Sequence, residues 1–541
     1  MPEAGHSGDL DTDVSSDVRF LLRFFAWRAF KAACSSLASV QALFFPPRRG
    51  LIAPPENQLL DLPIADLVHG IKSCAIRSED VVRAYIERIK IINPLINAVV
   101  DERFGDAIAD AQVIDRQLRS ISLDNESRAE LLLKPLLGIP FTCKDSIGVK
   151  SLIQSSGSFH RRDVRAEADA PAVTNLKAAG AIPLAITNVP EMLLWWESSN
   201  VLYGCTSNPY DLSRIAGGSS GGEAALLAAS GTAFGLGSDI GGSIRIPSAF
   251  NGVFGHKPSP GIVPSIGMYP EVTKGLLPFV SFGPIAKRAS ELPLLLEAMA
   301  DSEEIKRLRL NEPVELQSLN MMWMENEGGN PLFSAVSPEI MHKLHLAVSQ
   351  LQSRYNIPGK KVHFPSMLHT MHLWSACLVK GDPRNIADLL QQSSGRVVNP
   401  YAEIVKSLFG LSSFSFNILF LTVVQSFLGT KRDTSSYFKL NKIADRLRVQ
   451  VIDKLGERGF LLCPTMPEEA PIHSSTVLKG ADVSLCGIFN VLGLPATHIP
   501  LGLNRNGLPI GIQVVSRPDN DRICFAVAAA LEKMFGGFVN P

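Results

Sequence analysis

From about residue 59 onward, the apolar positions along the chain follow two different periods in turn. In residues 64–71, and again after Ser78, they recur every three or four residues, which predicts two amphipathic helices. We expect Ser78 to cap the second helix and Asn93-Pro94 to end it. The apolar face of this second helix consists of Val82, Tyr85, Ile86 and Ile89.

Short apolar runs lie between the helical patterns and predict buried strands at residues 136–143, 182–186, 319–324 and 511–515. Further helices are predicted at residues 172–179, 303–310 and 525–535. Strands that alternate with helices favour an α/β fold, here a large mixed, mostly parallel twisted sheet covered by helices on both faces. Because we find no internal repeat and no low-complexity linker, we predict one large domain, residues 51–541, behind an N-terminal appendage, residues 1–50.

The appendage contains the first of two strongly apolar segments. Residues 18–45 carry four basic side chains, and their uncharged part, residues 32–45, is shorter than the roughly 20 residues that cross a bilayer. Acidic residues precede the segment and no small-residue cleavage site follows, which argues against a signal peptide. Two interpretations stay open: a membrane anchor at the interface that ends at Arg48-Arg49, or a helix packed on the protein body.

The second apolar segment, residues 408–429, contains no charge over 22 residues. Its length alone is that of a transmembrane helix, but Ser412, Ser413, Ser415, Asn417 and Gln425 dilute it and it lies inside a globular pattern. A buried helix pair and a hydrophobic cap that dips into a membrane are both compatible with these residues.

Charge and cysteine content exclude several functional classes. Lys plus Arg and Asp plus Glu are both 52, so nothing favours a nucleic acid partner. The eight cysteines are scattered singly, with no CxxC pair and no Cys/His cluster at metal-binding spacing, so we expect reduced thiols and no metal.

Two glycine-serine loops, residues 217–222 and 237–242, contain the candidate chemistry. We expect a helix at 223–229 and a short strand at 233–236 between them. Glycine allows positive φ and lets several N–H groups point at one place, as a developing oxyanion requires. A serine at the end of such a loop is placed like a nucleophile.

Three similar motifs fit less well. Residues 217–221 match G-x-S-x-G, but the nucleophile elbow must follow a strand and residues 208–214 are polar and turn-like. Gly235-Leu236-Gly237 begins like a dinucleotide fingerprint, but the next glycine is one position late, and no Walker motif is present. Two glycine turns without chemical meaning would leave the paired serines unexplained.

Together these motifs resemble the amidase signature family. In that family GGSSGGE, here from Gly217, precedes DIGGSIR, here from Asp239, and a G-[IV]-P-x-x-x-K-[DE] pattern matches residues 138–145. The resemblance covers roughly residues 60–535. Residues 197–200 and the hydrophobic N-terminus resemble the corresponding sequences of the family members that hydrolyse fatty acid amides. The likeness continues at residues 187–188, 208–211, 254–259 and 507–513.

The resemblance implies a role for each motif residue. Ser243 looks like the nucleophile that forms an acyl-enzyme, Ser219 like a bridging serine, and Lys144 like a neutral general base. An amide nitrogen leaves poorly unless it is protonated, and a lysine relay can supply that proton. The implied oxyanion hole consists of the N–H groups of Ile240, Gly241, Gly242 and Ser243. The residues that would position the loops are Ser220, Asp239 and Arg245, and those that would line an acyl channel are Leu193 and Leu194.

The implied function is a serine amidohydrolase that cleaves fatty acid amides to a fatty acid and an amine, without a cofactor. The implied substrate is a small lipid-like amide, and the implied location is intracellular and membrane-associated, with the segment 408–429 as a hydrophobic cap. A homodimer is compatible with this function. A glutaminase subunit of an amidotransferase, or an amidase for other small carboxamides, stays an alternative. A catalytically idle scaffold would have lost Lys144, Ser219 or Ser243, and all three are present.

Overall fold

The computed structural model describes residues 48–120, 125–328, 330 and 333–541 of the chain. Most of the predicted N-terminal appendage, residues 1–47, therefore lies outside the described residues. Its last basic residues lie on the protein body: the Arg49 guanidinium is 3.1 Å from the buried carboxylate of Asp211, and the Arg48 N–H donates to the same group.

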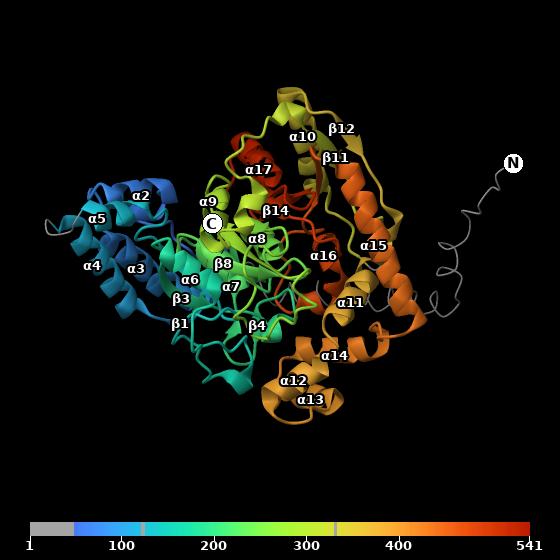
Figure 1. The fold of residues 1–541 in the computed structure, drawn as a ribbon. Coiled ribbons are helices and arrows are strands. Elements are labelled where there is room, and N and C mark those ends of the chain that lie inside the picture. The colour runs from blue at the N-terminus through green and yellow to red at the C-terminus, as the bar shows by residue number, and fades with distance from the viewer. Residues whose placement is uncertain (1–47, 121–124, 329, 331–332) are drawn as a thin grey trace.

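One large sheet crosses the centre of the molecule (Figure 1). Within the described residues it has 11 strands, and its order is β1-β3-β2-β8-β10-β9-β14-β15-β13-β11-β12. In that order the strands are Val99–Glu102, Ile182–Thr187, Pro140–Lys144, Gly235–Asp239, Ser281–Ala286, Phe254–Lys257, Ala496–Leu503, Pro509–Ser516, Gly459–Pro464, Asn320–Trp323 and Gly359–Lys361.

The sheet is mixed, as predicted, although its antiparallel pairings outnumber the parallel ones that the prediction favoured. Parallel pairing joins β3 to β2 and β2 to β8 on one flank, and β13 to β11 and β11 to β12 on the other. The strands between β8 and β13 pair antiparallel, as does β1 at the edge. Parallel pairing is thus confined to the two flanks, and the first flank is the one that leads to the glycine-serine loops.

Helices cover both faces of this sheet, which confirms the predicted fold class. Along β13, Phe460 and Leu462 belong to one apolar core, whereas Leu461 and Cys463 belong to another. Successive side chains of a strand point to opposite faces, so each core lies on its own side of the sheet. The first core includes α3 (Ser78–Ile96), α9 (Glu291–Met299), α10 (Pro338–Tyr355) and α17 (Asp521–Phe535). The second includes α11 (Thr370–Gly381), α15 (Ser435–Leu455) and α16 (Ser484–Val491).

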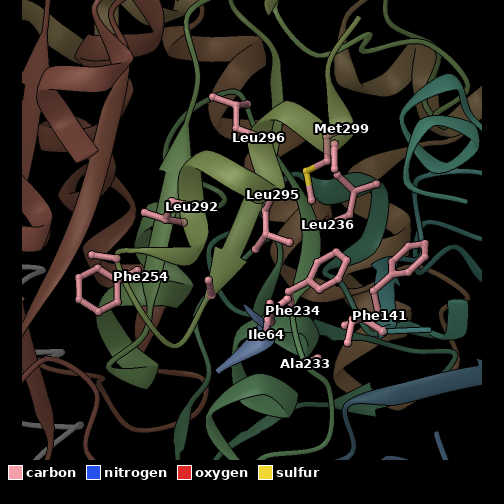
Figure 2. Close-up of a cluster of buried hydrophobic side chains, with 14 of the residues drawn as sticks. Ile64, Phe141, Ala233, Phe234, Leu236, Phe254, Leu292, Leu295, Leu296 and Met299 are labelled. Atoms are coloured by element: carbon pink, nitrogen blue, oxygen red, sulfur yellow. The ribbon is translucent and has the colours of Figure 1, made fainter. Parts of the chain in front are cut away.

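The first core packs beneath β2 and β8, the strands that lead toward the glycine-serine loops. Figure 2 shows Leu292, Leu295 and Met299 of α9 in one apolar cluster with Leu236 of β8 and Phe141 of β2. The rings of Phe141 and Phe234 stack with centroids 5.4 Å apart. Such packing fixes the positions of these strands.

The second predicted helix begins and ends differently from the prediction. The Ser78 hydroxyl donates to the Gly138 carbonyl, and the free N–H groups of Ser78 and Glu79 donate to Asp115 of α4 (Phe104–Arg119). The cap is therefore supplied by a neighbouring helix. Pro94 lies inside α3, which continues to Ile96 and stops where Asn97 adopts a left-handed conformation.

Most other predicted elements are present. They are α2 (Ile64–Lys72), α6 (Pro171–Ala178), α7 (Gly221–Ala228), β2, β3, β8, β11, β15 and α17. Of the helix predicted at 303–310, only a short 3₁₀ segment forms, Glu304–Leu308. The remaining helices are α5 (Asn125–Leu133) and α8 (Arg245–Asn251).

The apolar segment 408–429 is not one helix. Within it, α13 (Pro400–Leu408) ends and α14 (Phe416–Leu428) begins, and both lie beside α12 (Ile386–Ser394) at one end of the molecule (Figure 1). No helix in the described part of the chain is long and apolar enough to cross a membrane. Phe414, Ile418 and Leu419 are buried, but Phe409 and Phe427 are exposed, so the segment is only half buried.

Candidate active site

The site forms where two parallel strands end together. β2 ends at Lys144 and β8 at Asp239, and the two strands pair in parallel with Cys143 opposite Leu236. The carboxyl ends of parallel strands lie at the same edge of a sheet, which is where open α/β sheets bind ligands. The register therefore brings the lysine to the start of the second glycine-serine loop.

Lys144 is fully buried and its amine faces hydroxyl and carbonyl groups. Its Nζ lies 2.7 Å from Ser219 Oγ, 3.0 Å from Ser238 Oγ and 3.3 Å from the Ser238 carbonyl oxygen. Burial lowers the pKa of this amine to about 7, against a weaker opposing effect of the Asp239 carboxylate. About half of the amines are then neutral at neutral pH.

The neighbouring carboxylate does not reach this amine. Asp145 points to the other side of the strand end, where it accepts hydrogen bonds from the N–H and hydroxyl of Ser155 and from the N–H of Gly157. Neighbouring residues of a strand project to opposite faces, as expected. Burial raises the pKa of Asp145 to about 7.

Glu223 is a second buried carboxyl near the site. It accepts hydrogen bonds from the hydroxyls of Thr142 and Thr187, at 2.8 and 2.6 Å. Burial raises its pKa to about 8, so it is mostly neutral at pH 7. A charged Glu223 would raise the pKa of Lys144, and its neutral form helps to keep the amine neutral.

The loop that carries Ser219 approaches its neighbours too closely for side chains. A Cβ on Gly222 would lie 2.6 Å from the backbone nitrogen of Asn188, so only glycine fits there. The Gly218–Ser219 peptide bond is cis. Ser198 holds both ends of the loop, because its N–H donates to the Gly217 carbonyl and its hydroxyl accepts from the Gly221 N–H.

The second loop is organised around Asp239. This carboxylate accepts hydrogen bonds from the N–H groups of Gly242 and Ile244 and from the Arg245 guanidinium. The buried Arg245 keeps the pKa of Asp239 well below its usual range, despite burial, and also donates to Gln513 and Asn490. Asp239 and Arg245 thus hold the loop.

This arrangement corrects one part of the sequence prediction. The Gly242 N–H, expected in the oxyanion hole, already donates to Asp239 at 2.8 Å. Among the described residues, the N–H groups of Ile240, Gly241 and Ser243 have no hydrogen-bond partner. A Cβ on Gly242, whose φ is +119°, would lie 2.5 Å from Cys486 Cβ, so this glycine serves the turn itself.

Ser243 lies between the two loops and is partly exposed. The Ser220 N–H donates to the Ser243 carbonyl at 3.1 Å, and the Ser220 hydroxyl is 3.4 Å from the Ser238 carbonyl. Ser220 therefore ties the first loop to the second.

Trp374 of α11 was not predicted from the sequence. Its indole N–H donates to the Ile240 carbonyl at 2.9 Å, and a Cβ on Gly241 would lie 3.4 Å from its ring. The Ile240 carbonyl and the Gly241 N–H belong to one peptide group, and the C=O and N–H of a trans peptide point in opposite directions. Because the carbonyl points toward Trp374 on α11, the Gly241 N–H points away from α11. Local sequence gave no signal for Trp374, whereas Ser238 and Gln513 lie inside motifs already recognised.

Leu193 and Leu194, which the sequence predicts to line an acyl channel, are both partly buried. Leu194 packs against the apolar cluster that contains Met192, Leu390 and Phe414. Leu194 thus lies at the boundary with the α12–α14 helices.

The fold and site define a hydrolase that acts on amide C–N bonds. A family model described as Amidase matches residues 80–525, and the chain belongs to that family, the amidase signature family. It is 41% identical to fatty-acid amide hydrolase 2 of Homo sapiens over 494 residues, which covers 90% of this chain and 92% of the relative. The predicted relationship is thereby confirmed.

Two more distant proteins extend the comparison. One of them, a glutamyl-tRNA(Gln) amidotransferase subunit of Cyanothece sp., is 26% identical over 84% of this chain and 94% of its own. A solved structure of fatty acid amide hydrolase superposes with a TM-score of 0.71 at 21% identity, over 91% of this chain and 87% of that one. The structural likeness supports the fold.

Proposed function

We propose that the chain hydrolyses fatty acid amides through an acyl-enzyme on Ser243, with Ser219 and Lys144 as proton carriers. The observation that carries the proposal is the 2.7 Å contact between the buried Lys144 amine and Ser219 Oγ, with an amine pKa of about 7. Such a base is half neutral at working pH, where proton transfer is most effective.

The proton path follows from the contacts of the amine. A neutral amine has two N–H donors and one lone pair. The hydroxyl and carbonyl of Ser238 accept the two donors, which leaves the lone pair for the Ser219 hydroxyl proton. As Ser219 loses this proton to Lys144, it takes the proton of Ser243, and Ser243 Oγ attacks the amide carbon.

The oxyanion of the tetrahedral intermediate would accept hydrogen bonds from the N–H groups of Ile240, Gly241 and Ser243. Removing one such donor from an oxyanion hole typically costs about 10²–10³ in rate. Lys144 then returns its proton through Ser219 to the leaving nitrogen, the C–N bond breaks, and water hydrolyses the ester on Ser243.

A fluorophosphonate probe tests the assignment of the nucleophile. We expect peptide mass spectrometry to find one adduct per chain, on Ser243, and we expect Ser243→Ala to abolish both labelling and hydrolysis. Ser265→Ala, a matched change of a buried serine elsewhere, should retain both. An adduct on Ser219 or Ser220 would overturn the assignment.

The lipid substrate is supported by the relatives named for fatty acid amides and by the apolar residues around Leu194. Each buried CH₂ of an acyl chain contributes about 0.8 kcal/mol, or roughly fourfold in kcat/KM. We expect kcat/KM for a series of saturated primary amides to rise by up to that factor per carbon. A flat series, or preference for glutamine, would favour the glutaminase alternative.

Membrane association is part of the proposal. Exposed apolar side chains gather on α13, on α14 and in the turn between them: Tyr401, Val405, Leu408, Phe409, Leu411, Phe427 and Leu428. Singly exposed apolar residues are ordinary, whereas several on two packed helices and the turn between them favour an interaction surface. Deletion of residues 1–47 should weaken sedimentation with vesicles and leave turnover of a soluble short-chain amide unchanged.

A further inference from the structure

A second cluster of chemically reactive side chains lies outside the Lys144–Ser219 site. Glu197, Cys205 and His473 bring one potential ligand atom each within 4.8 Å of one another. Cys205 Sγ is 3.1 Å from His473 Nδ1 and 3.7 Å from Glu197 Oε1, and those two atoms are 3.4 Å apart. Sequence spacing did not predict this cluster, because 268 residues separate Cys205 from His473.

We propose that these three residues bind a zinc ion, as a structural clasp separate from the catalytic groups. Zinc in proteins is tetrahedral, with bonds of about 2.3 Å to sulfur and 2.0–2.1 Å to nitrogen or oxygen. Ligand atoms on such a tetrahedron are therefore roughly 3.3–3.6 Å apart, and the three measured separations scatter around that range. A water molecule would take the fourth position on the side where the His473 side chain is 24% exposed.

Neighbouring groups orient the ligands as a metal site requires. The second ring nitrogen of His473 lies 3.4 Å from the Ser207 hydroxyl, which can accept its N–H and leave Nδ1 free to bind. The other oxygen of Glu197 accepts from the Thr476 hydroxyl at 2.8 Å, and the Trp195 indole N–H donates to Thr476 in turn. The carboxylate is thus fixed with one oxygen directed at the cluster.

The charges also balance. A cysteine must lose its thiol proton to bind zinc. Zinc binding forms the Zn–S bond and releases that proton to solvent. One thiolate, one carboxylate and a neutral imidazole then neutralise the two positive charges of the ion, which suits a partly buried site.

The clasp would connect distant parts of the chain beside the catalytic loop. Its ligands span 276 residues, and Glu197 precedes Ser198, which holds the loop of Ser219 at Gly217 and Gly221. A metal that binds only the folded protein raises its unfolding temperature. The ion touches no proposed reacting group, so hydrolysis itself should not require it.

Cobalt and zinc titrations of the chelator-treated full chain test the proposal. Cobalt should produce a thiolate charge-transfer band in the near ultraviolet at one ion per chain, in the wild type and in the control Cys74→Ser, which changes an exposed cysteine. Cys205→Ser should lose the band, and His473→Gln should weaken binding at least tenfold. Zinc should raise the Tm of the wild type and of Cys74→Ser only.

Two results would overturn the clasp: no cobalt–thiolate band in the wild type, or a band and a zinc-dependent Tm shift that survive in both Cys205→Ser and His473→Gln. Hydrolysis of a soluble short-chain amide, measured well below Tm in EDTA, shows that each variant is folded. Retained turnover there also keeps this test independent of the proposed catalytic mechanism.

Discussion

Lys144 is the residue whose burial bears most directly on the proposed reaction, because burial lowers the pKa of its amine. At its ordinary pKa only about one lysine in 2,500 is neutral at pH 7. Burial without a facing carboxylate lowers the pKa to about 7, because Asp145 points away and Arg245 pairs with Asp239. Burial is therefore the cause of the lowered pKa, and the neighbouring carboxylates oppose it only weakly.

The first prediction concerns the pH dependence of hydrolysis. Because the neutral amine is the base, kcat/KM should rise with pH through one ionisation near pH 7 and level off above it. Lys144→Ala should lose about 10²–10⁴ in rate and flatten that limb, since general base catalysis typically contributes that much. A pH–rate profile of both proteins between pH 5 and 10 would check this.

Lys90→Met, on the exposed face of α3, is the control and should keep the wild-type profile. If kcat/KM of Lys144→Ala stayed near the wild-type value and rose with pH in the same way, another residue would be the general base.

The proposed reacting residues can be predicted from local sequence, whereas the groups that surround them cannot. Lys144, Ser219 and Ser243 lie in local motifs that can be read directly. The contribution of Glu223 depends on its contacts with Thr142 and Thr187, which lie on different strands, so spacing could not predict it. Spacing also could not predict that the Gly242 N–H donates a hydrogen bond to Asp239, because this depends on the orientation of the Asp239 side chain.

Among the elements, α11 links the proposed oxyanion donors to the α12–α14 helices. Trp374 near its start contacts the Ile240–Gly241 peptide, and the chain continues from its end, Gly381, into α12. The helix packs against α15 and α16 on the second core, so its position is fixed by apolar burial.

The second prediction tests this contact. Trp374→Phe keeps the ring and removes the indole N–H donor, so the Ile240 carbonyl is no longer held. One hydrogen bond contributes about 0.5–1.5 kcal/mol, and we expect kcat to fall up to about tenfold with KM nearly unchanged. Steady-state kinetics with a short-chain amide would measure this.

Trp323→Phe, on β11 near the opposite edge of the sheet, should leave kcat unchanged. A rise in KM alone for Trp374→Phe would mean that the indole contacts substrate rather than positioning the loop.

The third prediction concerns the exposed apolar surface of α13 and α14. Phe409→Ser and Phe427→Ser should each weaken vesicle binding tenfold or more, because burying one such side chain contributes about 1.5–3 kcal/mol. Long-chain amides presented in vesicles should be hydrolysed more slowly, and a soluble short-chain amide at the wild-type rate. Phe414 is unsuitable for this test, since it is 1% exposed and belongs to the core.

Leu133→Ser, an equally exposed position on α5, serves as the control and should bind vesicles like the wild type. Equal loss of activity on both substrates would indicate that these phenylalanines stabilise the fold instead.

At the scale of the whole molecule, hydrophobic periodicity was a reliable guide to the sheet and its covering helices, but less so to element ends. α3 continues through Pro94 because Asn97 supplies the left-handed stop, and Asp115 of another helix caps its start. Residues 408–429 carry no charge, yet they form only one short helix, α14, after the end of α13, and their neighbours α12 and Met192 bury only one side of it. Contacts between distant segments decide such features.

The fourth prediction is a stability difference that depends on pH. The pKa of Lys144 falls from 10.5 to about 7 on folding, so below pH 7 the folded state carries a buried ammonium at a cost of up to about 5 kcal/mol. Between about pH 7 and 10.5 only the unfolded state binds this proton, and stability rises with pH. Lys144→Met should therefore have a higher Tm than the wild type at pH 6, with the gap narrowing toward pH 10.

Thermal unfolding of both proteins at pH 6, 8 and 10 would measure the gap. The Tm of the control Lys90→Met should differ little from that of the wild type at each of the three pH values. A difference in Tm that does not change with pH would mean that folded Lys144 stays protonated between pH 6 and 10, as in the unfolded chain, and that packing alone distinguishes the variants.

The glycines of the catalytic loops also bear on how such an enzyme evolves. At Gly222 even one added carbon would collide with the Asn188 backbone, and at Gly242 with Cys486. Few substitutions can therefore be tolerated at these positions in the loops that would perform the reaction. The exposed side chains of α13 and α14 meet no such restriction. Descendants of this chain would acquire new substrates by changing the helices at that end while inheriting the same reactive centre.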